Sequence, residues 1–336
     1  MSRIKERHGI MAWLHGRKGQ QATVIVLFMI VPLLLLFTFT YLPFGSMIGY
    51  SFYRMKYVGT RVWVGLDNYI SVFQRDDCFG ALKNSLYYLG GALFQLVFAL
   101  FLATILSFKV RGGNIFKGLI FFPFLVNGIA LGFIFKFFYA RGFVFDTILQ
   151  GFGFNLDDLP YWLKDQRINN ISLAATSVWR YLGQNMVLFI GAIMSVDSEM
   201  YEAATLDGAG KFKQFLYIIL PNIKTIVILN IILSVTGSIA AFEPAYVITN
   251  GGVGTATYFY VMHTVAHTSQ KVGVASAMAV ILLFIIILVT ILQKLLFKYV
   301  FRDSDSDSGN YAARRRERSL ARYRRWHKND SREKAF

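Results

Sequence analysis

Long apolar runs without charge alternate along this chain with shorter polar segments. Residues 19–53 and 84–108 carry no charged side chain, and residues 168–196 carry only Arg180. A helix needs about 20 mostly apolar residues to cross the hydrocarbon core of a bilayer. The runs therefore predict six membrane-spanning helices, near residues 22–46, 85–107, 115–138, 171–195, 224–247 and 272–296.

The first apolar run could also belong to a secretory signal peptide. Its length exceeds the roughly 7–15 residues of a signal-peptide core, and no small-residue cleavage site follows it. We therefore expect it to be retained as the first spanning helix.

The composition supports a membrane protein. Hydrophobic residues make up 55% of the 336 residues and charged residues only 16%, whereas soluble domains carry about 25% charged residues. Much of the surface must therefore face something other than water. The single cysteine, Cys78, excludes an internal disulfide. The predicted class is an all-α membrane protein with six transmembrane helices.

Lysine and arginine gather in four segments, which indicates the orientation. These segments are the N-terminal arm, the connections after the second and fourth spans, and the C-terminal tail. Cytoplasmic segments of membrane proteins carry an excess of Lys and Arg. With six spans, all four segments lie on one side, so we expect both termini in the cytoplasm. The expected organisation is an arm at 1–21, a spanning domain at 22–300 and a basic tail at 301–336.

The tail carries much of the net charge of +16, with ten Lys or Arg among residues 312–336. Anionic lipid headgroups at the cytoplasmic surface attract such clusters. We expect the tail to contact membrane lipid. The alternatives are contact with the ATPase, contact with nucleic acid, and a simply solvated tail.

The connection after the fourth span, residues 197–221, predicts two helices separated by a turn. Asp197 or Ser198 can cap the first helix, with Glu199 and Glu202 in its first turn, near the positive end of the helix dipole. Gly208 is expected to end this helix, because glycine readily adopts the left-handed conformation of a helix terminus. By these features alone, the segment is an amphipathic cytoplasmic loop.

The second helix of this loop should begin at Lys211 and end at Pro221, which turns the chain into the fifth span. Its apolar positions follow helical spacing and predict a stripe that lies along the end of the helix bundle. They are Phe212, Phe215, Leu216 and Ile219.

The loop also carries a sequence pattern. Glu202-Ala203-Ala204 is followed by Gly208, then by Ile218, then by Leu220-Pro221. This spacing resembles, without a gap, the EAA loop of permease subunits of binding-protein-dependent ABC importers. The resemblance implies that the first helix is a coupling helix, which docks into a cytoplasmic ATPase. The implied coupling residues are Glu202, Ala203, Ala204, Asp207, Gly208, Leu220 and Pro221.

The resemblance extends over roughly residues 22–300. Residues 64–69 are similar to an external segment of sugar permeases, and residues 242–252 to the stretch after the fifth span, although Val253 replaces the usual proline. The implied fold is the type I importer permease fold of maltose, glycerol-3-phosphate and multiple-sugar permeases. The implied partners are a second, similar permease, two ATPase subunits, an extracellular or periplasmic solute-binding protein and a sugar, in a bacterial cell membrane.

The chain itself is not expected to be an enzyme. It contains no G-x-x-x-x-G-K-[ST] phosphate loop. ATP and Mg²⁺ are therefore expected on the partner ATPase, and no cofactor is expected here. His263 and His267 are four residues apart, as in some metal pairs, but a third ligand is lacking. An ordinary polar face is the favoured interpretation, and we predict no catalytic residue and no metal site.

Polar residues inside two spans are the candidate substrate ligands, because such residues tend to face the interior of a helix bundle. The fourth span places Ser177, Arg180, Tyr181 and Gln184 on one face, and the fifth places Ser234 and Ser238 together. In the maltose permease, the positions matching all of these except Arg180 lie among those lining the sugar site. Serines can equally join helices to each other. Arg180 needs a partner, for which Glu243 and a polar substrate are both candidates. Asn127, Lys136, Asn185 and Asn230 are lesser candidates.

The favoured function is import of a carbohydrate, an oligosaccharide by resemblance, through alternating access. A type I permease for a non-sugar solute remains an alternative. An ion channel would need rings of pore-lining charges or filter loops, and a membrane enzyme would need clustered catalytic groups. The sequence shows neither pattern.

Overall fold

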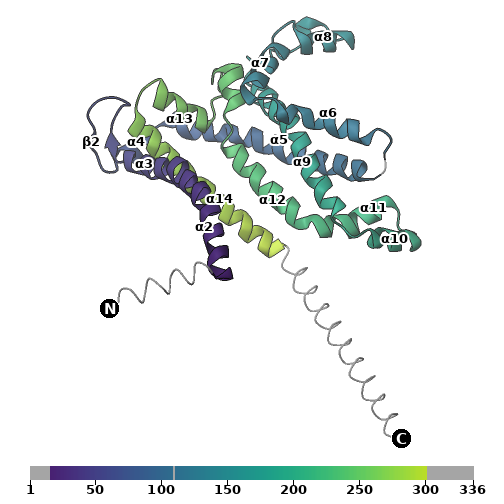
Figure 1. Cartoon of the computed structure of the whole chain (residues 1–336). Helices are drawn as coiled ribbons and strands as arrows, with labels where there is room; N and C mark the ends of the chain where they lie inside the picture. Colours follow the sequence, from purple (N-terminus) through teal and green to yellow (C-terminus); the bar gives the residue numbers. More distant parts are fainter. Residues whose placement is uncertain (1–15, 109, 301–336) are drawn as a thin grey trace, which may run out of the picture. The chain divides into compact units, whose positions relative to one another are not determined.

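The computed structural model describes residues 16–108 and 110–300, which are predominantly helical (Figure 1). The tail and most of the N-terminal arm lie outside the described residues, so the predictions for them stay predictions. The chain divides into two compact units. One comprises the residues up to Phe79 together with Val261–Leu282, and the other comprises Gly80–Tyr260 together with the residues from Leu283 onward.

The first unit begins with a long apolar helical stretch. It consists of α2 (Arg17–Leu36), a π-helical turn (Phe37–Tyr41) and α3 (Leu42–Tyr50). Pro43, near the start of α3, has no N–H to donate, and its ring crowds the carbonyl four residues earlier. The wider π turn directly before it accommodates this ring without ending the helix. Within the described part of the chain, no residue from Val24 to Tyr50 is buried, as suits a helix that faces lipid or another subunit.

The first unit also contains a small two-stranded sheet and a short helix. Strands β1 (Tyr53–Arg54) and β2 (Val62–Trp63) pair antiparallel, and α4 (Asp67–Phe73) follows them. Helices α13 (Tyr258–His267) and α14 (Val272–Val300) each contribute part of their length to this unit. Nδ1 of His267 lies 3.0 Å from the hydroxyl oxygen of Tyr57, within hydrogen-bonding distance. Among the described residues, no group of three His, Cys, Asp or Glu side chains is placed to hold a metal ion. The polar-face interpretation of His263 and His267 stays a prediction.

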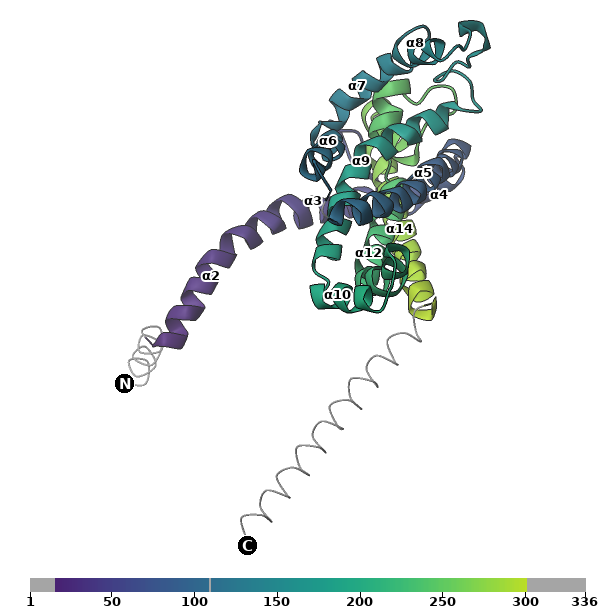
Figure 2. The same ribbon diagram turned by 90° about the vertical axis from the view of Figure 1, so that its right-hand side faces the viewer.

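The second unit contains most of the helices. In chain order they are α5 (Asp76–Ser107, beginning in the first unit), α6 (Gly113–Leu125), α7 (Gly128–Phe138), α8 (Val144–Gly151), a 3₁₀ turn (Leu156–Asp158), α9 (Asn169–Met194), α10 (Ser198–Leu206), α11 (Lys211–Gln214), a π turn (Phe215–Ile219), α12 (Leu220–Ile239) and a second π turn (Ala245–Thr249). Both views place α10 at the end of this unit opposite α8 (Figures 1 and 2).

The prediction of one straight helix for the third span is wrong. Residues 115–138 form α6 and α7, which meet at an angle of 99° around Val126 and Asn127. Pro123 weakens the end of α6 because it lacks an N–H. Asn127 then caps α7 by accepting a hydrogen bond from the Ile129 N–H at 2.9 Å. Asn127 therefore has a structural role at the bend.

Four helical stretches are long and apolar enough to cross a membrane, by length and composition. They are Val24–Tyr50, Asp76–Ser107, Lys211–Ile239 and Val272–Tyr299, and the bent α6–α7 pair would make a fifth. Helix α9 has the length for the predicted fourth span, but its polar face keeps it out of this set. The count of six spans stays a prediction.

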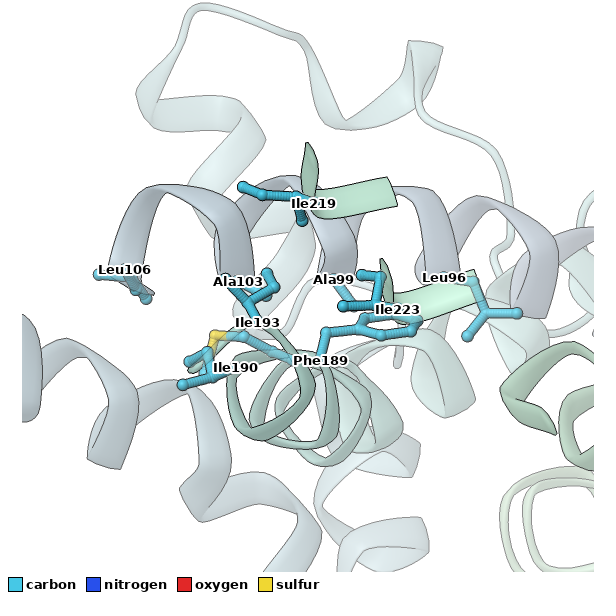
Figure 3. Packing of buried hydrophobic residues seen from close by; sticks show 10 residues of the cluster. Leu96, Ala99, Ala103, Leu106, Phe189, Ile190, Ile193, Ile219 and Ile223 are labelled. Carbon is cyan, nitrogen blue, oxygen red and sulfur yellow. The ribbon is translucent and has the colours of Figure 1, made fainter. Parts of the chain in front are cut away.

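A buried apolar cluster joins three helices of the second unit (Figure 3). Residues of α5, at spacings of three and four, meet residues of α9, of the π turn before α12 and of the beginning of α12. Two alanines of α5 allow close approach. This packing fixes the distances between the three helices. The cluster comprises Leu96, Ala99, Ala103, Leu106, Met186, Phe189, Ile190, Ile193, Ile219 and Ile223.

Candidate functional site

Helices α5, α9 and α12, together with residues 240–244, line a partly open pocket of about 360 Å³. We call it the polar pocket after its hydroxyl and amide side chains, although apolar atoms make up most of its accessible lining. Its lining combines hydroxyl and amide side chains with aromatic rings. The lining residues with polar or aromatic side chains are Tyr88, Gln95, Ser177, Tyr181, Gln184, Asn185, Asn230, Ser234, Ser238, Phe242 and Glu243.

The structure brings the candidate substrate residues together. Ser177, Tyr181 and Gln184 of α9 and Ser234 and Ser238 of α12 all line the polar pocket. Arg180 lines a much smaller pocket that shares Ser177, Tyr181 and Glu243 with the first. Asn185 and Asn230 also line the polar pocket, whereas Lys136 is exposed on α7. The role of these residues in binding a substrate stays a prediction.

Arg180 meets the partner that the sequence suggested. Its Nη1 lies 3.4 Å from Oε1 of Glu243, and its guanidinium lies 5.2 Å from the centre of the Tyr181 ring. Arg180 Nε is buried without a hydrogen-bond partner among the described residues. Gly128 makes room for the pair, because a Cβ there would lie 2.5 Å from Arg180 Nη1 and 2.8 Å from Glu243 Oε1. The pair thus packs directly against the first residue of α7.

Sequence reasoning missed two pocket residues on α5, Tyr88 and Gln95. Both are buried, with 4% and 3% exposure. The Tyr88 hydroxyl and Gln95 Nε2 have no hydrogen-bond partner among the described residues. Buried polar groups are nearly always hydrogen-bonded, so these two atoms are suited to a polar ligand or water in the pocket. Their spacing of seven residues, two helical turns, was the available sign that they share a face.

The EAA loop, residues 197–221, forms a short helix and a tight turn. Asp197 caps α10 by accepting a hydrogen bond from the Glu199 N–H at 3.1 Å, as predicted. The helix ends at Leu206, and Gly208 follows with φ +75°. The Ala209 N–H donates to the Ala204 carbonyl at 2.8 Å, which closes a Schellman-type helix end.

The structure corrects one detail of α10. Glu202 is the fifth residue of the helix and lies in its second turn, not its first, because α10 begins at Ser198. Glu202, Ala203, Asp207 and Gly208 are exposed and Ala204 is partly exposed. Burial raises the pKa of the Tyr201 hydroxyl, on the side of α10 that packs against Phe108.

The predictions for the second helix of the loop are partly wrong. Pro221 does not end it, because α11, the π turn and α12 form one continuous helical stretch from Lys211 to Ile239. The π turn again directly precedes a proline and accommodates its ring, while Leu220 and Pro221 begin α12.

The predicted apolar stripe on this helix is likewise displaced. Phe212 is 73% exposed and Leu216 is 38% exposed, whereas Ile219 is fully buried and Phe215 is partly buried. The inward face instead contains Gln214 and Ile218 beside Ile219. A π turn holds more residues than an α-helical turn. The residues after it therefore face a different direction from the one that a 3.6-residue period predicts.

Apolar helices with a pocket among them, and an exposed helix and turn at one end, are the features expected of a membrane transport protein. The chain belongs to the family of binding-protein-dependent transport system inner membrane components, whose model matches residues 95–302. It is therefore a translocation subunit and a multi-pass cell membrane protein, and the resemblance to ABC importer permeases is confirmed.

Relatives of known name agree with this family. The chain is 30% identical over 248 residues to the arabinooligosaccharides transport system permease protein AraP of Bacillus subtilis, covering 71% of this chain and 77% of the relative. It is also 30% identical over 277 residues to the diacetylchitobiose uptake system permease protein NgcF of Streptomyces coelicolor, covering 78% of each.

The fold has a counterpart among solved structures. A chain of a bacterial ABC transporter involved in the import of the acidic polysaccharide alginate superposes with a TM-score of 0.72 at 16% identity. The match covers 84% of this chain and 97% of that one. The type I ABC permease fold is thereby confirmed.

Proposed function

We propose that this permease carries a carbohydrate, an oligosaccharide, across the bacterial cell membrane by alternating access. The observation that carries the proposal is the lining of the polar pocket, where hydroxyl and amide groups from three helices surround one space. Sugar hydroxyls both donate and accept hydrogen bonds, and sugar ring faces pack on aromatic rings such as Tyr181 and Phe242. The names of the two relatives, which refer to arabinooligosaccharides and diacetylchitobiose, support the same cargo class.

The charges of the pocket favour a neutral cargo. Among the described residues that line the two pockets, Arg180 and Glu243 are the charged ones, and they pair with each other. An ion pathway would present unpaired charges or rings of carbonyl groups. The pocket therefore suits a neutral polar molecule better than an ion or a charged solute.

The complex needs further subunits to do this work. The proposed partners are a second permease, two ATPase subunits that bind ATP and Mg²⁺, and an extracellular or periplasmic solute-binding protein. One solved relative of this fold is an alginate ABC transporter in complex with its alginate-bound periplasmic protein, which supports the last partner. Both termini and the EAA loop are proposed to be cytoplasmic, so that the exposed residues of α10 can meet the ATPase.

The test is uptake of sugars by cells that express the complete complex. The probes are radiolabelled arabinotriose, diacetylchitobiose and maltotriose. At least one should be taken up, and Gln184→Ala should weaken its apparent affinity about tenfold, the effect of losing one to two hydrogen bonds to the cargo. Gln150→Ala, at an exposed glutamine of α8, is the matched control.

Two results would contradict the proposal. One is the absence of uptake for all three sugars together with uptake of an unrelated solute. The other is unchanged affinity in Gln184→Ala, Tyr181→Ala and Gln95→Leu, because all three side chains line the same pocket.

A further inference from the structure

The turn between α10 and α11 is held by a buried side chain that belongs to neither the polar pocket nor the EAA sequence pattern. Gln214, the last residue of α11, is only 2% exposed. Its Nε2 donates to Thr205 Oγ1 at 3.0 Å and to the Ala209 carbonyl at 3.1 Å. One side chain therefore binds both α10 and the turn that follows it.

The bond to Thr205 continues into α10. The Thr205 hydroxyl donates to the Tyr201 carbonyl at 2.7 Å, one helical turn earlier. These hydrogen bonds, from Gln214 to Thr205 and from Thr205 to Tyr201, thus reach the middle of α10. α10 and α11 are also connected by the tight turn at Gly208. Tyr201 of α10 and Lys211 of α11 both contact the Phe108 ring. Because these are ring contacts and a left-handed glycine, the hydrogen bonds of Gln214 are the directional link between the two helices.

On its other side, Gln214 is part of a long continuous helix. The stretch from Lys211 to Ile239 includes α12, which contributes Asn230, Ser234 and Ser238 to the polar pocket. Ile219 and Ile223, at the beginning of this stretch, pack in the apolar cluster with α5 and α9 (Figure 3). A displacement that reaches Gln214 can therefore be passed along one helix to the pocket.

We propose that Gln214 is a positioning residue that fixes α10 to the α11–α12 helix, so that ATPase-driven displacement of α10 reaches the pocket-lining residues of α12. Without its two hydrogen bonds, α10 still docks through its exposed residues but turns about Gly208 independently of α12. ATP is then hydrolysed without a matching movement at the pocket. This inference rests on the proposed function, because it assumes a docked ATPase and a transported sugar.

The experiment uses the complete complex in proteoliposomes with its ATPase subunits and solute-binding protein. The probe is whichever of arabinotriose, diacetylchitobiose and maltotriose the wild-type complex transports. The quantity measured is the number of sugar molecules transported per ATP hydrolysed. A general folding defect lowers transport and hydrolysis together, whereas loss of positioning lowers their ratio.

Gln214→Met keeps the size of the side chain but removes both donors. We expect its ratio to fall about fivefold to tenfold, because breaking these two partly buried hydrogen bonds shifts the balance between fixed and hinged α10 by this order. Thr205→Val should lower the ratio as well, and Thr205→Ser, which keeps the hydroxyl, should restore it. The double variant Gln214→Met/Thr205→Val should be no worse than Gln214→Met alone, because the residues act in one network.

Ser195→Ala is the matched control, since Ser195 donates only to its own helix, at the Ala192 carbonyl. Its ratio should equal that of the wild type. A wild-type ratio in Gln214→Met, or loss of the ATPase from that complex, would overturn the proposal. If the Gln214→Met permease is not inserted into the membrane, the Thr205→Val and Thr205→Ser pair decides: equal ratios in the two overturn the proposal. A wild-type complex that transports none of the three sugars but takes up an unrelated solute would instead contradict the proposed function.

Discussion

Gly183 is the position where one added carbon should most disturb the pocket. It lies on α9 between Tyr181 and Gln184, where α9 crosses α6. A Cβ at Gly183 would lie 2.6 Å from the Phe121 Cα and would also clash with the Ile120 carbonyl. Ordinary contact begins at 3.4 Å, so the backbone of α6 would have to retreat by more than 0.8 Å, because the Ile120 carbonyl oxygen lies closer than the Phe121 Cα.

The expected cost of Gly183→Ala is that of overpacking. Because the neighbours are backbone atoms, no side-chain rotation can relieve the clash, and the cost should be about 1–3 kcal/mol. The displacement also separates Phe124 of α6 from Tyr181, whose ring centres lie 6.1 Å apart. Sugar uptake should therefore fall together with stability.

Gly191→Ala provides a matched control on the same helix. Nothing lies within 4 Å of a Cβ built at Gly191, so only the gain in helix propensity remains, and this gain is common to both variants. Thermal unfolding of the purified complex should place Gly183→Ala below Gly191→Ala, by about 2–4 °C for each kcal/mol. Equal midpoints would refute the close approach of α6 and α9.

Three further outcomes are expected. Gly208→Arg should reduce ATPase retention or sugar-stimulated hydrolysis without preventing membrane insertion, because a side chain opposes the φ of +75°. Normal retention together with normal hydrolysis would show that the loop is not the coupling element. Arg180→Met should lower expression or uptake by leaving Glu243 unpaired, and Arg180→Met/Glu243→Gln should recover part of the loss; no recovery would argue against the pair. Reporter fusions should place Arg111 in the cytoplasm and Asp158 outside, and the reverse would exclude the predicted orientation.

The sequence by itself determined the class of protein and its most local features. Charge-free runs identify the apolar helices of a membrane protein. The requirement of about 20 apolar residues depends on composition and not on how the helices pack. The cap at Asp197 and the turn at Gly208 were also predictable, since each follows from the backbone preferences of a single residue. Helical spacing placed Ser177, Tyr181 and Gln184 on one face, and that face lines the pocket.

Tertiary structure decided where regular periodicity fails and which side chains lack partners. The bend at Asn127 and the π turn before Pro221 depend on how a proline is accommodated between packed helices, which a 3.6-residue pattern does not contain. Tyr88 and Gln95 lie in an apolar span whose sequence does not mark them as pocket residues. They line the pocket because α9 and α12 pack beside α5 at this level. The sequence pattern assigns no role to Gln214. The folding back of α10 onto α11 buries it, because burial depends on contacts between segments that are separate along the chain.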